Sequence, residues 1–278
     1  MSRITFLMSE TAEKARMETE LKTARTVQET LFPAAGLSNG RFQLGGRIIA
    51  ASECGGDWWY HFEVGDQVWI WVGDATGHGV PAALLTSAAR AVASVVQRSV
   101  EGSDLRSQKF SPSQAMNLLN SAIYDVSKGH LMMTFFLAVV DQPTGLLTYV
   151  NASHEPAMIL AARNSKARER DFKVIEGENN PRLGESAQYQ FKESKYQLMS
   201  GDRLIIYTDG VFDVVNTAKK NLGEREFFRA LGTKLFEHSA DKDYVESSID
   251  SMVKHFDNYR EGAALIDDVT LVICKYEG

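Results

Sequence analysis

The sequence is poor in cysteine, has no long apolar run and carries no excess of basic residues. Its two cysteines, Cys54 and Cys274, cannot build a disulfide framework, so we expect a reducing, cytoplasmic compartment. The best apolar run, residues 131–140, has about half of the ~20 residues that a membrane-spanning helix needs, and no signal peptide is visible over residues 1–10. With 30 basic against 36 acidic residues, the net charge of −6 argues against a protein that coats nucleic acid.

What is present is the composition of an ordinary globular protein. Hydrophobic residues make up 44% of the chain and charged residues 24%, which excludes wholesale disorder. A chain of 278 residues has room for one or two domains. The texture of the sequence changes after Pro33, so we divide the chain into a helical linker over residues 1–33 and one folded domain over residues 34–278.

The linker is expected to be one helix. Residues 9–32 contain no Gly or Pro, and Pro33 ends the pattern. Five positions recur at 4-3-4-3 spacing and form a seam with one polar member: Met17, Leu21, Ala24, Gln28 and Leu31. Two readings stay open. The helix either lies along its own domain, or it forms a coiled coil that pairs two chains or joins an upstream sensor module.

The remainder of the chain predicts an α+β fold. Strands are expected over residues 41–50, 68–72, 132–140, 146–150, 157–160, 203–207 and 269–274, and helices over residues 81–97, 112–126, 224–237 and 241–259. The strands are joined by hairpins rather than in βαβ units. This order favours two antiparallel sheets packed as a central sandwich and flanked by helices. The basic stretch 163–173 is expected to be a solvated hairpin loop.

Four aspartates at the edges of predicted strands are the candidate functional residues: Asp57, Asp74, Asp209 and Asp267. A carboxylate beside a buried strand is costly unless it has a partner, and few Lys or Arg residues lie near these four in the sequence. Oxygen ligands without His or Cys at ligand spacing favour Mg²⁺ or Mn²⁺. Four carboxylates suffice for two metals that share one acid. Each aspartate taken alone is equally well explained as a turn residue.

The segments around these acids resemble the SpoIIE/RsbU-type serine phosphatases, the bacterial branch of the protein phosphatase 2C (PPM) superfamily. The motifs occur in order as Gly55-Gly56-Asp57, Gly73-Asp74-Ala75-Thr76-Gly77-His78-Gly79-Val80-Pro81-Ala82-Ala83, Thr134-Phe135-Phe136, Tyr149-Val150-Asn151-Ala152-Ser153-His154-Glu155-Pro156, Gly201-Asp202-Arg203-Leu204, Tyr207-Thr208-Asp209-Gly210-Val211 and Asp267-Asp268-Val269-Thr270. The stretch from Ala24 to Pro33 is similar to the linker that precedes the domain in this family. The resemblance covers about residues 15–276 and implies a PPM-phosphatase-like sandwich.

The resemblance implies a site and a reaction. Asp57, Asp74, Asp209 and Asp267 would hold two Mn²⁺ or Mg²⁺ ions, with Asp74 bridging them and the backbone carbonyl of Ala75 as a further ligand. The reaction would be hydrolysis of phosphoserine or phosphothreonine by metal-activated water, without a phosphoenzyme. Without metal, four carboxylates would repel a phosphate dianion, so metal loading should be obligatory.

The resemblance also implies partners. The expected substrate is a phosphorylated bacterial signalling protein, such as an anti-sigma-factor antagonist of the STAS type. For the N-terminal helix, pairing in a homodimer and connection to an upstream sensor module both stay open. The alternative function is a pseudophosphatase, a binding module that keeps the fold and acts by docking a partner. A nuclease is disfavoured because the acidic balance offers little to hold a nucleic-acid backbone.

Several residues near the motifs depart from the family or have no assigned role. Tyr60 stands where many members have an acid, and Ser153 replaces a usual glycine. Thr76 occupies the position at which the eukaryotic branch has a proposed general acid, so no general acid is assigned. His78 and His154 are expected to be structural, Cys54 is expected to be a buried small residue, and the role of Asp268 stays open between ligand tuning, a weaker third metal position and structure. The aromatic run around residues 58–71 is expected to be a sheet core.

Overall fold

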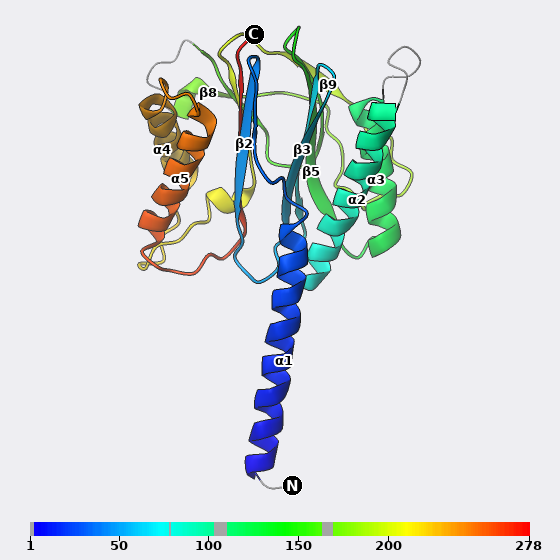
Figure 1. The fold of residues 1–278 in the computed structure, drawn as a ribbon, viewed down its shortest axis with the longest axis vertical. Helices are drawn as coiled ribbons and strands as arrows, with labels where there is room; N and C mark the ends of the chain where they lie inside the picture. Colours follow the sequence, from blue (N-terminus) through cyan, green and yellow to red (C-terminus); the bar gives the residue numbers. More distant parts are fainter. Residues whose placement is uncertain (1–2, 78, 103–109, 163–168) are drawn as a thin grey trace.

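The computed structural model describes residues 3–77, 79–102, 110–162 and 169–278. His78, which was expected to be a structural loop residue, lies outside the described residues. So do residues 163–168 of the basic stretch 163–173, which was expected to be a solvated hairpin loop. The described part consists of a body with two sheets between two pairs of helices, from which one long helix projects (Figure 1).

The helices and strands follow one another in the order α1 (Arg3–Glu29), β1 (Leu37–Ser38), β2 (Phe42–Ile49), β3 (Asp57–Val64), β4 (Gln67–Ala75), α2 (Val80–Gly102), α3 (Pro112–Ser127), β5 (Met133–Asp141), β6 (Leu146–Ala152), β7 (Met158–Leu160), the 3₁₀ turn η1 (Glu169–Asp171), β8 (Phe172–Val174), β9 (Ser194–Gln197), β10 (Arg203–Tyr207), the 3₁₀ turn η2 (Asp209–Val211), α4 (Glu224–Glu237), α5 (Tyr244–Arg260) and β11 (Val269–Tyr276). The four predicted body helices match α2 to α5 to within a few residues at each end. Good end signals explain this accuracy, for example the capping box that Ser111 and Gln114 form at the start of α3.

The strands form two antiparallel sheets, which confirms the predicted fold class. One sheet has the order β1-β2-β11-β10-β7-β8 and the other β3-β4-β5-β6-β9. One buried cluster, which includes Phe136 and Ile206, fills the space between the two sheets. A second cluster packs α2 and α3 on the β3–β9 sheet, and a third packs α4 and α5 on the other sheet. The body therefore has four layers, with helices outside and sheets inside (Figure 1).

The aromatic run is core, as predicted. Trp58, Trp69 and Trp71 are fully buried and lie in the cluster beneath α2 and α3, whereas Trp59 faces the space between the sheets. This alternation defines β3, which the list of predicted strands omits. The omission has a physical cause: a strand with aromatic residues on both faces shows no alternation of apolar and polar positions.

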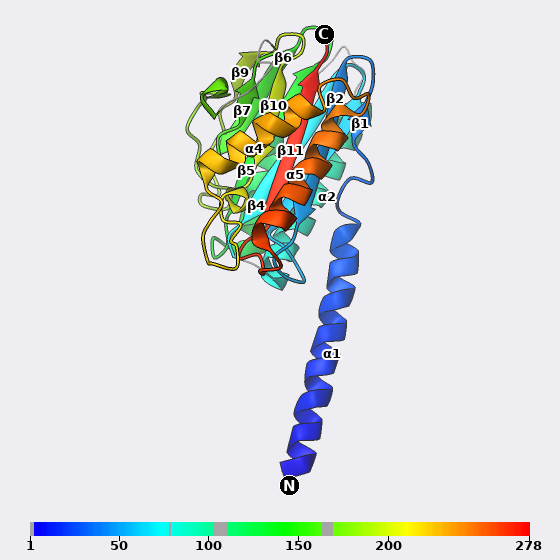
Figure 2. The ribbon, with the colours of Figure 1, turned by 90° about the vertical axis from the view of Figure 1, so that its left-hand side faces the viewer.

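Helix α1 does not lie along the body. Figures 1 and 2 show that it projects away and approaches the body only near its C-terminal end. It also begins earlier and ends earlier than predicted, at Arg3 and Glu29. Met17 and Val27 are more than half exposed, whereas Gln28 is buried. Of the two readings of the seam, the one in which the helix covers its own domain is therefore wrong.

Helix α2 is the one described helix that is long and apolar enough to cross a membrane, judged by length and composition alone. No membrane span was expected from the sequence. In the structure, Ala89, Ala93 and Val96 of this helix are fully buried against the β3–β9 sheet. A core helix of this kind meets the same length and composition criteria.

Candidate active site

The fold brings the four predicted aspartates to one end of the sandwich, two from each sheet. Asp57 opens β3 and lies directly opposite Asp74 of β4 in the antiparallel register. Asp209 follows β10 at the start of η2, and Asp267 precedes β11. The two pairs meet because Thr208, next to Asp209, is hydrogen-bonded to the Asp57 carboxylate across the sandwich.

Asp57 is buried, and two threonines support it. Thr208 Oγ1 donates a hydrogen bond to Asp57 Oδ2 at 2.8 Å, and Thr270 Oγ1 donates to the same oxygen. The backbone N–H of Thr270 in turn donates to Thr208 Oγ1 at 3.1 Å. Burial and the neighbouring charge of Asp74 raise the pKa of Asp57 well above its ordinary value, although the two threonine hydrogen bonds act against that rise.

Asp74 lies at the electrostatic centre of the group. Burial, followed by the charges of Asp209 and Asp267, raises the pKa of Asp74 to about 7. Burial is also the main cause that raises the pKa of Asp267. None of the four aspartates forms an ion pair with a described Lys or Arg. The site thus concentrates negative charge that no described side chain neutralises.

These residues fit a divalent cation in chemistry but do not form a closed cage. Carboxylate oxygens without thiol or imidazole partners are the donors that Mg²⁺ and Mn²⁺ prefer. Burial, followed by the charges of neighbouring carboxylates, raises the pKa values of Asp57 and Asp74. Among the described residues, however, no three His, Cys, Asp or Glu side chains lie close enough together to hold one metal ion.

The backbone around the acids is packed too closely for larger residues. The N–H of Ala75 donates to the carbonyl of Gly56 at 3.1 Å, and a Cβ atom added to Gly56 would lie 2.8 Å from the Ala75 carbonyl oxygen. A Cβ atom on Gly210 would lie 1.9 Å from the carbonyl oxygen of Asp268. The glycines beside the acids therefore let neighbouring segments of the same sheet approach each other closely, Gly56 against Ala75 and Gly210 against Asp268.

Three supporting residues were not predicted as part of the site. Thr208 and Thr270 stand in the quoted motifs, but nothing in the sequence indicates that both reach Asp57. Gln28 of α1 is the third: its Nε2 donates to the carbonyl of Gly55 at 2.8 Å, and its Oε1 accepts the N–H of the same residue at 3.1 Å. The sequence signal that could have identified Gln28 was its polar side chain in an otherwise apolar seam.

Other singled-out residues form no described hydrogen bond or ion pair with the four acids. Tyr60 points from β3 towards α2, where the Arg90 guanidinium stacks 3.9 Å from the ring centroid. Cys54 is 1% exposed, as expected for a buried small residue. His154 is buried, as expected: its Nδ1 lies 3.0 Å from the Glu155 carbonyl, and burial lowers its pKa to about 4.

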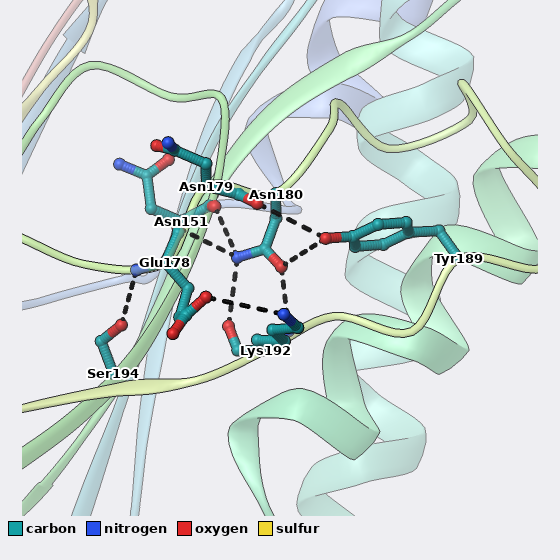
Figure 3. A network of polar contacts seen from close by, with 7 residues as sticks. All are labelled: Asn151, Glu178, Asn179, Asn180, Tyr189, Lys192 and Ser194. Atoms are coloured by element: carbon teal, nitrogen blue, oxygen red, sulfur yellow. Dashed lines mark hydrogen bonds and ion pairs between the residues drawn. The ribbon is translucent and has the colours of Figure 1, made fainter.

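A second polar cluster, centred on Asn180, is structural (Figure 3). Its Nδ2 donates to the carbonyls of Asn151, Glu178 and Lys192 at 3.1 to 3.3 Å, and its Oδ1 accepts from the Lys192 N–H and the Tyr189 hydroxyl. The amide is thus fully used in joining three chain segments. A cavity of about 630 Å³ borders this cluster, but none of the four aspartates lines it.

Solved structures similar to this chain have the same architecture. The SiaA-PP2C domain of Pseudomonas aeruginosa superposes with a TM-score of 0.72 over 95% of this chain and 99% of that domain, at 20% identity. The structure of RsbX in complex with magnesium gives a TM-score of 0.57 over 87% of this chain and 98% of that one, at 13% identity. The fold is that of the PPM-type serine phosphatases.

The sequence comparisons define the family within that class. The chain belongs to the SpoIIE family, because the model described as Stage II sporulation protein E (SpoIIE) matches residues 64–277. It is similar to the phosphoserine phosphatase RsbU of Bacillus subtilis, with 24% identity over 93% of this chain and 70% of RsbU. It is also similar to the phosphoserine phosphatase RsbP of the same organism, with 25% identity over 72% of this chain but only 47% of RsbP. The predicted resemblance is confirmed.

Proposed function

We propose that this chain hydrolyses phosphoserine or phosphothreonine on a signalling protein, using two divalent cations held by Asp57, Asp74, Asp209 and Asp267. The observation that carries the proposal is the meeting of these four acids, two from each sheet. None of them is ion-paired with a described Lys or Arg side chain. The names of RsbU and RsbP as phosphoserine phosphatases support the reaction.

Each residue has a distinct task in this proposal. Asp74, which senses the charges of Asp209 and Asp267, would bridge the two ions, and the Ala75 carbonyl would add a further oxygen. Bound cations would lower the pKa of a water molecule and offset the charge of the phosphate. Thr208 and Thr270 hold Asp57 in one orientation, so that its second oxygen, Oδ1, stays available. The preference for Mn²⁺ or Mg²⁺ follows from the all-oxygen donor set.

The substrate proposed is a phosphorylated regulator of the STAS type, an anti-sigma-factor antagonist. This choice rests on the family and on the relatives named above. The charge of the four acids implies that the cations bind before the substrate. Without metal, the acids would repel a phosphate group. We further propose that the projecting helix α1 pairs two chains or connects to an upstream sensor module.

Replacement of the bridging acid tests the proposal. Asp74→Asn is expected to lower kcat by at least about 100-fold, because loss of a mere outer partner of a metal ligand already costs about 10–100-fold. Turnover of p-nitrophenyl phosphate and of a phosphoserine peptide would be measured with Mn²⁺, Mg²⁺ or EDTA. EDTA should abolish wild-type turnover, and Mn²⁺ should restore it.

Asp66 provides the matched control. It lies exposed in the turn at the far end of the same β3–β4 hairpin, so Asp66→Asn makes the same chemical change away from the acids. This variant should keep wild-type turnover. Asp74→Asn with near wild-type rates, or wild-type activity that survives EDTA, would contradict the two-metal proposal.

One observation favours the alternative, a docking module without catalysis. No three described acid, thiol or imidazole side chains lie within reach of one metal ion. A folded wild-type protein that neither binds Mn²⁺ nor turns over either substrate, yet still binds a phosphorylated partner, would support this alternative.

A further inference from the structure

Asp268 holds the backbone of the loop that carries Asp57. Its side chain is 5% exposed, and its two oxygens accept hydrogen bonds from three backbone N–H groups. Oδ1 accepts from Ala51 at 2.7 Å, whereas Oδ2 accepts from Gly56 at 2.6 Å and from Asp57 at 3.3 Å. Ala51 and Gly56 belong to the connection between β2 and β3, and Asp57 is the first residue of β3.

This connection crosses from one sheet to the other. Strand β2 belongs to the sheet of β10 and β11, and β3 belongs to the opposite sheet. Asp268 stands immediately before β11, so its carboxylate ties the crossing loop to the sheet that also presents Asp267. Asp267 is fixed by the same turn, because its Oδ1 accepts the backbone N–H of Asp268 at 2.8 Å.

The surrounding glycines leave just enough room for the Asp268 carboxylate. A Cβ atom on Gly55 would lie 2.5 Å from Asp268 Oδ2, and one on Gly210 would lie 1.9 Å from the Asp268 carbonyl oxygen. The residue is therefore confined from both sides. Its oxygens are also directed to backbone N–H groups, which is the bonding of a structural anchor rather than of a metal ligand.

We propose that Asp268 is a positioning residue, which sets the distance between Asp57 and the acids of the opposite sheet and thereby the affinity of the site for divalent cations. The inference rests on the proposed function, since it assumes that the four aspartates bind metal. It assigns to Asp268 none of the metal coordination itself. Loosening the loop would let Asp57 move away from Asp267 and Asp209 without removing a ligand.

The test is Asp268→Asn. The amide places one NH₂ group where an oxygen accepted an N–H, so one of the two oxygen positions loses its acceptor whichever way the amide turns. Mn²⁺ binding would be measured by isothermal titration calorimetry, and the melting temperature of the metal-free protein by calorimetry. We expect Mn²⁺ affinity to fall by about 10–100-fold, the usual effect of losing a partner behind a metal ligand.

Asp202→Asn is the matched control. Asp202 is also 5% exposed, and it accepts the backbone N–H groups of Ala162 at 3.2 Å and Met199 at 3.0 Å, beside β10 at its other end. Both substitutions should lower the melting temperature. Only Asp268→Asn should weaken Mn²⁺ binding, which a general loss of stability would not do selectively.

Gly55→Ala serves as a second variant if Asp268→Asn does not fold. Its methyl group would press on Asp268 Oδ2 without removing the charge, whereas Gly40→Ala adds a methyl group with nothing within 4 Å. Gly55→Ala should weaken Mn²⁺ binding, and Gly40→Ala should not.

The outcomes separate the two proposals. Wild-type protein that binds Mn²⁺, together with Asp268→Asn or Gly55→Ala protein that binds it equally well, overturns the positioning role alone. Wild-type protein that shows neither Mn²⁺ binding nor turnover overturns the proposed function, and the positioning role with it.

Discussion

Asp57 is held at one oxygen and left free at the other. Thr208 and Thr270 both donate to Oδ2, and no described residue donates to Oδ1. Burial and the neighbouring charge of Asp74 raise the pKa of this carboxyl group. A cation at Oδ1 would oppose this rise without disturbing the threonines. The two hydroxyl groups thus determine which oxygen faces the other acids.

His154 should make stability depend on pH. Burial lowers its pKa from 6.5 to about 4, so the folded protein binds fewer protons than the unfolded chain between these values. The free energy of unfolding should therefore fall as the pH falls from 6.5 to about 4, by up to about 3 kcal/mol from this residue. Urea denaturation of wild type and His154→Phe at pH 7 and pH 4.5 would measure the effect.

The comparison between these two proteins isolates the histidine from the aspartates, whose raised pKa values act in the opposite direction. The free energy of unfolding of the variant minus that of wild type should be larger at pH 4.5 than at pH 7. An equal difference at both pH values would contradict the prediction.

At the level of single residues, the sequence predicted which acids lie at strand ends but not what surrounds them. Asp74, Asp209 and Asp267 stand beside strands whose apolar runs are readable, and Asp57 precedes an aromatic run. The hydrogen bond from Thr270 to Asp57 joins residues 213 positions apart, and that from Gly56 to Asp268 joins residues 212 apart. Such contacts exist only once the sheets have packed, so no local pattern reveals them.

At the level of elements, Gln28 joins α1 to the loop that carries Asp57. Its amide is paired with both backbone groups of Gly55 and lies 3.2 Å from Thr86 Oγ1 of α2. A cavity of about 260 Å³ beside this contact is lined by α1 and β2 residues and also reaches Asp57. The last turn of α1 is therefore joined by direct hydrogen bonds to the loop that leads into Asp57.

Gln28→Ala should lower both stability and activity. The substitution leaves the two backbone groups of Gly55 without their partner, at a cost of about 1–3 kcal/mol for each group that stays buried and unpaired. We expect kcat/KM to fall by about 10-fold or more, because the loop behind a proposed metal ligand is loosened. Chemical denaturation and phosphatase assays would measure the two effects.

Lys22→Ala is the control, because Lys22 is exposed on the same helix. A pair of truncations separates the contact from the projecting part of the helix: deletion of residues 1–16 keeps Gln28, whereas deletion of residues 1–31 removes it. Activity that is equal in both truncations and in wild type would show that α1 does not act on the site.

Besides β3, two strands that were missed have a weak local signal. Strand β9 reads Ser-Lys-Tyr-Gln and β8 has three residues, and both lie at sheet edges. Their strand conformation comes from pairing with β6 and β7 rather than from their own apolar pattern. The capped and strongly amphipathic helices needed no such help.

At the level of the whole molecule, α1 extends as a helix of 27 residues, about 40 Å long, from a compact body (Figure 2). An isolated helix in water gains little stability without tertiary packing. Met17 is 56% exposed, and it shares the seam with Leu21. These features favour pairing with another helix.

We therefore expect a dimer at micromolar concentration, formed through the α1 seam. Met17→Glu combined with Leu21→Glu should give a monomer, because it places like charges opposite one another across the seam. Light scattering coupled to size exclusion would report the mass. Replacement of Lys22 and Thr26 by Glu, at exposed positions outside the seam, is the control and should preserve the dimer. A wild-type monomer at every concentration would contradict the prediction.

The four aspartates come two from each sheet, so ions bound by them would join the sheets and stabilise the fold. Metal supply would then affect the lifetime of the protein as well as its activity. Ions bound across the sheets, at about 100 times their dissociation constant, would stabilise the fold by about 2.7 kcal/mol. Cellular proteases cleave chains that open transiently, at a rate that follows how often they open. A cell short of manganese or magnesium would therefore degrade this protein faster, so that its abundance and its turnover decline together.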